Sequence, residues 1–200
     1  MPKTVKEAAK LDANNGDTKW MDVISKEMTN VRVAFDIMKD RDRAPIGHKH
    51  INCHLIYDVK MEYFRLKARL VAGVHMTETP KCMIYSSVVG QETVRIALTI
   101  SALNNLQVKE GDVMSAYITA PRSEKIWTVL GKEFGSYQGK KSIIVHALYG
   151  LKSSGAAFHA QLADCMRSIG YTPCRGDNDL WMKPEIDPDE DKCNSYPRPN

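Results

Sequence analysis

The sequence predicts an α+β fold, and three features of its apolar pattern carry that prediction. Segments near both ends of the chain repeat apolar residues at the spacing of a helix, about 3.6 residues per turn. Two runs in the first half alternate apolar and polar residues, as a pair of neighbouring strands does. Further strand-like runs are separated by helical segments, so helices and strands are mixed within one chain.

Two helices are predicted at the N-terminus. Thr4 and Glu7 have the spacing of a capping box, in which each side chain accepts from a free amide of the first turn. This helix should end near Asn14, because Gly16 can take the left-handed conformation that terminates helices. The second helix follows from apolar residues at helical spacing, namely Trp20, Ile24, Met28 and Val31.

A hairpin is predicted between residues 55 and 70, with its turn at residues 61–63. Apolar and polar residues alternate on both sides of that turn. Because neighbouring side chains of a strand point to opposite faces, Arg65, Lys67 and Arg69 should share one face. Three like charges on one face repel one another unless solvent or an anion neutralises them. From the residues alone, this face fits an anion site or a solvated strand surface.

The second half predicts further helices and strands. A strand over 106–113 would place Asp112 on one face with Glu110. The remaining elements are helices at 91–103 and 158–169, the latter capped by Gly170, and strands at 126–130, 142–147 and 180–182. After Lys183 the chain is acidic, interrupted by proline and nearly free of apolar residues, so residues 184–200 are predicted to be a disordered tail.

Charge and composition narrow the classes of function. The 200 residues carry a net charge of +4, divided into −3 over residues 175–200 and +7 over the rest. A basic body is typical of a protein with a polyanionic partner such as nucleic acid. No apolar run is long enough for a membrane span, and the N-terminus lacks the apolar stretch of a secretion signal. We therefore expect an intracellular protein that is not secreted and has no membrane partner. Its five cysteines include no Cys-x-x-Cys pair and should be free thiols.

Three segments of the chain form a pattern in a fixed order, namely Arg65-Leu-Lys-Ala-Arg-Leu-Val-Ala72, Gly111-Asp-Val-Met-Ser-Ala-Tyr-Ile118 and Ala147-Leu-Tyr-Gly-Leu-Lys-Ser-Ser154. Together they resemble the copia-type retrotransposon reverse transcriptase. The family reads roughly Arg-Tyr-Lys-Ala-Arg-Leu-Val-Ala, Asp-Val-Lys-Thr-Ala-Phe-Leu and Ala-Leu-Tyr-Gly-Leu-Lys-Gln-Ser-Pro. Weaker matches lie at Trp20 with Glu27, at 87–89 and at 179–181. The resemblance covers about residues 5–183.

This resemblance implies a partial right-hand polymerase fold and an activity. Residues 1–183 would form the N-terminal part of a reverse transcriptase domain, with fingers over about 1–105 and the start of the palm over about 106–183. The family adds dNTPs to a primer by a two-metal mechanism that uses Mg²⁺. Its partners are an RNA or DNA primer-template and the incoming dNTP, and this chain would be a fragment of such an RNA-directed DNA polymerase.

The resemblance also implies roles for single residues. Asp112 matches the first catalytic, metal-binding aspartate, and the Val113 carbonyl would be a further metal ligand. The residues implied to contact the dNTP are Lys67, Arg69, Val113, Tyr117 and Tyr149, and those implied to contact nucleic acid are Arg65, Gly150 and Lys152. Tyr117 would act as a gate against a ribose 2′-hydroxyl by steric clash. From the residues alone, Asp112 also fits a turn or cap, and Tyr117 also fits a core aromatic.

The chain departs from the family at two places. Ser153-Ser154-Gly155 replaces Gln-Ser-Pro, which changes the contacts of residue 153. The Tyr-x-Asp-Asp turn that carries the other two catalytic carboxylates does not occur in the 200 residues. Asp177-Asn178-Asp179 precedes the strand at 180–182 and is not its equivalent. We therefore expect a reverse transcriptase truncated before that motif and inactive as this chain.

Other interpretations remain open. The chain could be a non-catalytic nucleic-acid-binding remnant, a domesticated protein-interaction domain or a pseudogene product that does not fold stably. A metal site made of His48, His50, Cys53 and His54 is disfavoured. On an extended segment Cys53 would point away from the histidines, and no second ligand pair lies at zinc spacing.

Overall fold

The computed structural model describes residues 1–39, 41–73 and 86–184. The chain forms two compact units, each described here by itself. Unit 1 comprises residues 1–86 and 110–162, and unit 2 comprises residues 87–109 and 163–200. Both contain helix and strand, which confirms the α+β class. The expected disordered tail lies outside the described residues, apart from Pro184, and the division into fingers and palm stays a prediction.

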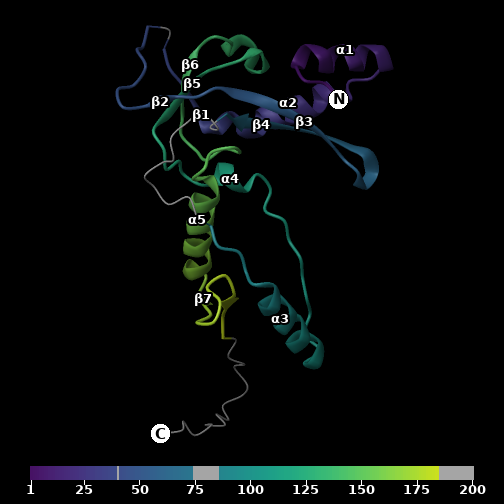
Figure 1. Cartoon of the computed structure of the whole chain (residues 1–200), viewed down its shortest axis with the longest axis vertical. Coiled ribbons are helices and arrows are strands. Elements are labelled where there is room, and N and C mark those ends of the chain that lie inside the picture. Colours follow the sequence, from purple (N-terminus) through teal and green to yellow (C-terminus); the bar gives the residue numbers. More distant parts are fainter. Residues whose placement is uncertain (40, 74–85, 185–200) are drawn as a thin grey trace, which may run out of the picture. The chain divides into compact units, whose positions relative to one another are not determined.

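Unit 1 holds two sheets and the helices that cover them (Figure 1). A four-stranded sheet has the order β1-β6-β5-β2, in which only the β2–β5 pair is parallel. A separate hairpin pairs β3 with β4 over eight residues each, so that Cys53 faces Ala72 and Lys60 faces Arg65. The elements of unit 1 are α1 (Val5–Asn15), α2 (Lys19–Val31), β1 (Phe35–Ile37), β2 (Lys49–His50), β3 (Cys53–Lys60), β4 (Arg65–Ala72), α4 (Ala116–Thr119), β5 (Ile126–Val129) and β6 (Lys141–Ile144), with 3-10 turns η1 (Arg32–Ala34), η2 (Glu62–Phe64) and η3 (Lys132–Tyr137).

Unit 2 is smaller and has little core of its own. It contains α3 (Gln91–Leu103) and a two-stranded pair made of β7 (Thr172–Pro173) and β8 (Trp181–Met182). Helix α5 (Ser154–Ser168) begins in unit 1 and ends in unit 2. No residue of α3 is buried, although its apolar spacing predicts a packed helix.

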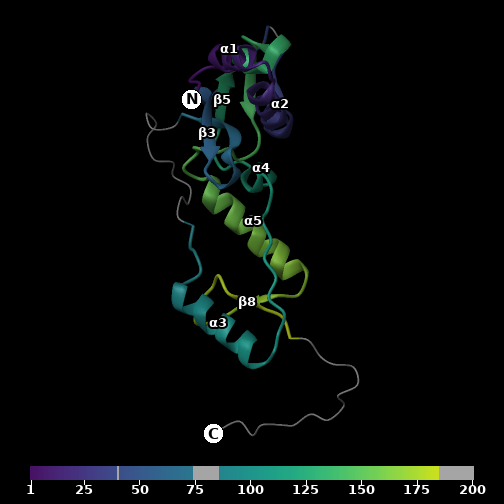
Figure 2. The same ribbon diagram turned by 90° about the vertical axis from the view of Figure 1, so that its right-hand side faces the viewer.

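The core of unit 1 includes buried residues of α2, of the hairpin and of the four-stranded sheet, among them Phe35, Ile126 and Ile144. Helix α2 packs against β4, and both N-terminal helices lie at the same end of the unit as the hairpin (Figures 1 and 2). The inward residues of β4 are buried, with Leu70 fully so, while the residues between them remain partly exposed. Trp20 of α2 meets Tyr57 of β3 edge to face, with ring centroids 5.7 Å apart. Burial of one face of each element therefore fixes the hairpin register.

The predicted N-terminal caps are confirmed. The Thr4 hydroxyl accepts from the Glu7 amide at 3.2 Å, and the Glu7 carboxylate accepts from the Lys3 amide at 2.8 Å. The reciprocal bond of the capping box therefore goes to Lys3, one residue earlier than expected. Helix α1 ends at Asn15, and Gly16 follows with φ of 69°.

The predicted strand over 106–113 is wrong. These residues form an irregular segment between α3 and α4 and pair with no described strand. Alternation along a sequence only proposes a strand, because an extended segment also needs a neighbour to satisfy its backbone amides and carbonyls. Asp112 therefore does not lie at the end of a strand.

The other predicted elements are found with small shifts in their bounds. The expected strand at 142–147 is shorter and begins one residue earlier, as β6. The helix expected over 158–169 begins four residues earlier, as α5, and Gly170 follows its C-terminal end with φ of 90°. Of the five cysteines, Cys53, Cys165 and Cys174 are described, and all three are free thiols. No helix within the described residues is both long enough and apolar enough to cross a membrane.

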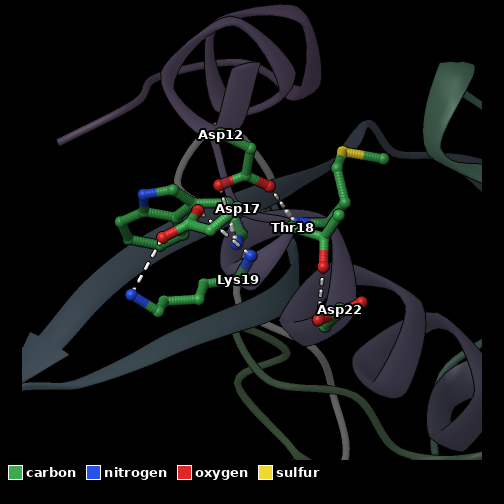
Figure 3. Close-up of polar contacts among 7 residues, drawn as sticks. Asp12, Asp17, Thr18, Lys19 and Asp22 are labelled. Atoms are coloured by element: carbon green, nitrogen blue, oxygen red, sulfur yellow. Dashed lines mark hydrogen bonds and ion pairs between the residues drawn. The ribbon is translucent and has the colours of Figure 1, made fainter. Parts of the chain in front are cut away.

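Asp12 connects the first two helices. Its side chain is 4% exposed, and its two carboxylate oxygens accept from the backbone amides of Trp20 at 3.1 Å and Met21 at 2.9 Å (Figure 3). These amides lie in the first turn of α2, where no intrahelical acceptor exists. Thr18 stands at the N-cap position, but its hydroxyl donates to Asp22 instead of accepting from the helix. Asp12 thus caps α2 from the neighbouring helix.

Replacing Asp12 by alanine should destabilise unit 1. The variant leaves two amides without an acceptor in a buried place, which costs about 1–3 kcal/mol of the free energy of unfolding. Asp22→Asn is the matched control, because Asp22 is exposed and its loss should change stability by less than about 0.5 kcal/mol. Urea denaturation followed by tryptophan fluorescence measures both variants. Equal stabilities for the two would contradict the capping role.

Candidate functional site

The outward face of β4 carries a row of positive charge. Arg65, Lys67 and Arg69 alternate with buried apolar residues, so all three point to the same side, as the sequence predicts. Arg65 is exposed, whereas the other two are half-buried. Burial lowers the pKa of Lys67, and the neighbouring charges of Arg69 and Lys60 lower it further. The face therefore has an excess of positive charge at a partly desolvated place, where an anion gains most.

Glu27 supports this face from behind. Its Oε1 accepts from the Leu70 amide at 2.9 Å and so links α2 to β4. Burial raises the pKa of the Glu27 carboxyl, while the bond from Leu70 and the charges of Arg69 and Lys67 act in the opposite direction. The sequence singles out Glu27 only as a weak family match, because its partner lies on a distant strand.

Three of the residues implied to bind a nucleotide form one continuous row. The Arg69 guanidinium carbon lies 5.1 Å from the centre of the Tyr149 ring. The Tyr149 and Tyr117 ring centroids are 4.9 Å apart, and Tyr117 lies 6.3 Å from Phe158 of α5. Arg69 Nε is buried and has no hydrogen-bond partner within the described residues. The row therefore places a cation beside packed aromatic rings.

Gly150 lets the row form. The Tyr149 carbonyl accepts from the Ala72 amide at 2.8 Å, which docks this loop on the end of β4. Gly150 has φ of 90°, and a Cβ built there would collide with the Ala72 carbonyl oxygen and with Val71 Cγ1. Only glycine can adopt this backbone so close to the strand. The local backbone thus requires glycine here, and the contact with nucleic acid implied for Gly150 stays a prediction.

The residues after Gly150 point in different directions. Lys152 is exposed in the turn before α5. Ser153 is 2% exposed and donates its hydroxyl to Glu124 at 2.6 Å, while Ser154 donates to the Leu148 carbonyl at 2.6 Å. The hydroxyl of Ser153, which replaces Gln of the family pattern, and that of Ser154, which matches it, are thus both bonded within the protein.

Asp112 and Val113 are not part of a metal-ligating cluster within the described residues. Both are exposed in the irregular segment before α4, and Val113 is 53% exposed. Within residues 1–39, 41–73 and 86–184, no three His, Cys, Asp or Glu side chains lie close enough together to hold a metal ion. A pair of Mg²⁺ ions needs several carboxylates to offset their mutual repulsion. The described donor set therefore does not fit the two-ion site of the family.

Asp177, the carboxylate that precedes the strand at 180–182, stabilises the backbone and is not part of a metal cluster within the described residues. Asp177 accepts from the amides of Gly90 at 2.9 Å and Asp179 at 3.0 Å, and the bond from Gly90 lowers its pKa. It therefore holds the start of α3 within unit 2.

In the segment with the histidines, the His50 ring packs on Trp127 with ring centroids 4.6 Å apart, and burial raises the pKa of Cys53 to about 12. A thiol that stays protonated is a poor metal ligand.

Comparison with known proteins identifies the relatives of this chain. Residues 34–187 match the family described as reverse transcriptase (RNA-dependent DNA polymerase). A curated relative is the retrovirus-related Pol polyprotein from transposon TNT 1-94 of Nicotiana tabacum, which is 26% identical over 153 residues. That alignment covers 70% of this chain and 11% of the relative, so the chain spans about a tenth of that protein. No solved structure matches.

Glu27 should make stability depend on pH in a defined direction. Its pKa in the folded chain is above the ordinary value of 4.5, so the folded state keeps a proton that the unfolded state has released. Its contribution is therefore complete below pH 4.5 and is lost as the pH rises through the folded pKa. Glu27→Gln keeps an oxygen for the Leu70 amide and removes this loss.

The measurement is urea denaturation of both proteins between about pH 4 and pH 7, the range over which a glutamate of raised pKa ionises. The stability of Glu27→Gln relative to the natural chain should improve as the pH rises. Glu27→Ala is the control for the hydrogen bond and should be about 1–3 kcal/mol less stable than Glu27→Gln at every pH. A difference between Gln and Glu that is flat over the range would refute the assignment.

Proposed function

Since the chain belongs to the reverse transcriptase (RNA-dependent DNA polymerase) family, we propose that it forms the fingers and the start of the palm of a copia-type retrotransposon polymerase and supplies one side of its nucleotide pocket. In this proposal the fingers span about residues 1–105 and the start of the palm spans about 106–183. The observation that carries the pocket is the row from Arg69 through Tyr149 to Tyr117. It brings together residues from three separate segments of the family pattern.

Arg69 and Lys67 are suited to the triphosphate of a dNTP. A guanidinium binds phosphate oxygens in pairs, and an ammonium binds them as a point charge. The Tyr149 ring holds the Arg69 side chain from one side, so less side-chain entropy is lost when the phosphate binds.

Tyr117 is suited to exclude a ribonucleotide. A steric gate needs a ring that cannot move aside, since its discrimination comes from a clash. Tyr117 is half-buried between Tyr149 and Phe158, and α4 and α5 carry two of these three rings. This packing supports a fixed gate for a tyrosine, where the family more often has phenylalanine.

The 200-residue chain alone should not extend a primer. The family places Mg²⁺ between three carboxylates, and Asp112 with the Val113 carbonyl would be the contribution of this chain. Asp112 is exposed and belongs to no cluster of three or more metal-ligating side chains within the described residues. We therefore propose nucleotide and nucleic-acid binding without catalysis for this chain.

Removal of Arg69 should abolish most of the nucleotide binding. We expect Arg69→Ala to weaken the binding of dTTP at least tenfold, measured by calorimetric titration, because a charge-assisted phosphate contact is lost. Arg69→Lys should bind dTTP with an affinity between that of the natural chain and that of Arg69→Ala. Arg41→Ala is the matched control, since it removes the same charge from an exposed loop and should leave affinity unchanged.

Two outcomes would contradict this proposal. Equal effects of Arg69→Ala and Arg41→Ala would mean that the row is not the nucleotide site. Incorporation of dNTPs by the natural chain in a primer-extension assay, lost in Asp112→Asn, would show that the chain is catalytic after all.

A second function, non-catalytic binding of nucleic acid, is favoured by the basic face of β4. Each phosphate contact releases counterions, so log Kobs should fall with log salt by about 0.7 per contact on a single strand.

Arg65→Ala should reduce the magnitude of that slope by about 0.7, the value for one phosphate contact, because Arg65 is exposed on this face. Fluorescence anisotropy with a labelled oligonucleotide measures the slope. Oligonucleotide binding without dTTP binding would favour this function over the first, and a slope unchanged by Arg65→Ala would exclude Arg65 as a contact.

A further inference from the structure

Glu124 makes a short hydrogen bond to a buried serine at the start of α5. Ser153 Oγ donates to Glu124 Oε1 at 2.6 Å, and Ser153 is 2% exposed. Glu124 itself is half-buried in the bend before β5. A hydroxyl that donates to a carboxylate over about 2.5–2.7 Å makes a bond roughly twice as strong as one between neutral groups. This bond therefore restrains the two segments that it joins.

The bond joins the two segments that carry three packed aromatic rings. Tyr117 of α4 lies seven residues before Glu124. Tyr149 lies four residues before Ser153, and Phe158 lies five residues after it. These two rings pack on Tyr117, with centroid distances of 4.9 and 6.3 Å. Ser153 is thus central to the stretch that holds the Tyr117 ring, and Glu124 connects that stretch to the segment of Tyr117.

Main-chain contacts bring the same two segments together at another place. The Ala147 amide donates to the Ala120 carbonyl at 3.0 Å, and Pro121 and His146 form an antiparallel bridge. Accordingly, α4 lies beside the start of α5 in both views (Figures 1 and 2). These main-chain contacts hold residues 146–147. The side chain of Glu124 acts further along the chain, where α5 begins.

We propose that Glu124 is a positioning residue, which acts through Ser153 to hold the Tyr117 ring as a rigid barrier to a ribose 2′-hydroxyl. The two rings on either side of Ser153 transmit this restraint, because both pack on Tyr117. A group that must keep a fixed geometry needs neighbours that are themselves locked by hydrogen bonds. The inference rests on the proposed function, which assigns the gate to Tyr117, and it adds the residue that sets the selectivity of that gate.

Ser154 provides a matched comparison for Ser153. It is 1% exposed, and its hydroxyl donates to the Leu148 carbonyl at 2.6 Å. This bond is as short as the one to Glu124, but it stays within residues 148–154 and makes no connection to the segment of Tyr117. Loss of the Ser154 hydroxyl therefore removes a buried bond without releasing the gate.

The test compares the affinities of the full chain for dTTP and for 5-methyluridine triphosphate, which differs from dTTP only by its 2′-hydroxyl. Glu124→Ala should bind 5-methyluridine triphosphate at least about threefold more tightly than the natural chain does, because the ring can move aside. Its dTTP affinity should change by less than about twofold, since the cations of β4 still contact the triphosphate. Calorimetric titration measures both affinities. A purely structural defect would weaken the binding of both nucleotides.

Further variants assign the effect to the one bond. Glu124→Gln should keep the natural selectivity, because the amide oxygen still accepts from Ser153. Ser153→Ala should reproduce Glu124→Ala, and the combined variant should add nothing, since both changes remove the same bond. Ser154→Ala should keep the natural selectivity even if its thermal midpoint falls. Natural selectivity in Glu124→Ala, or an equal loss of selectivity in Ser154→Ala, would overturn the proposal.

Nitration of tyrosines by tetranitromethane tests the position of the ring without any nucleotide. Tyr117 is half-buried, whereas Tyr63 is 96% exposed and serves as the internal reference. Peptide mass spectrometry should show faster nitration of Tyr117 in Glu124→Ala and the natural rate in Glu124→Gln, with Tyr63 unchanged in both variants.

The two measurements separate this inference from the proposed function. A natural chain that binds no dTTP, but in which nitration of Tyr117 depends on Glu124, would remove the nucleotide pocket and leave Glu124 as the residue that positions the ring. A natural chain that binds dTTP, combined with unchanged nitration and unchanged selectivity in Glu124→Ala, would remove the role of Glu124 alone.

Discussion

Unit 1 depends on the packing of α2 against β4. Leu70 is fully buried at this contact, and its backbone amide is held by Glu27 of the helix. Because side chains alternate along a strand, burying Leu70 forces Lys67 and Arg69 to the opposite face. The position of these positive charges is therefore a consequence of core packing. The same packing partly desolvates Lys67, which lowers its pKa.

The end of β4 positions the aromatic part of the site in the same way. The Tyr149 carbonyl accepts from Ala72, so the loop that follows β6 is docked by a main-chain bond. Gly150 allows this approach where a side chain would collide with β4. The Tyr149 ring then lies against Arg69 without any direct bond between the two. A main-chain bond thus sets the position of Tyr149, and the Tyr117 ring packs against it.

Local patterns predicted the local structure well. The capping pair at Thr4 and Glu7, the helix over 91–103 and the alternation of the hairpin all depend on neighbours within a few residues. The contact of Arg69 with Tyr149 could not be predicted from spacing, because it joins distant segments; only the family resemblance placed both residues at one site. The strand expected at 106–113 failed for the same reason, since its pairing partner is not a property of its own sequence.

The two halves of the expected polymerase site differ in what holds them. Cations and rings are placed by β4, α4 and α5, all of which the described chain supplies. Carboxylates that share metal ions must be held much more rigidly, because like charges repel at short range and separate unless a sheet fixes them. Asp112 lies on an irregular, exposed segment that provides no such support. If the proposed nucleotide pocket exists, its cations and rings are therefore preformed where the metal ligands are not, and nucleotide binding would be separable from catalysis in this chain.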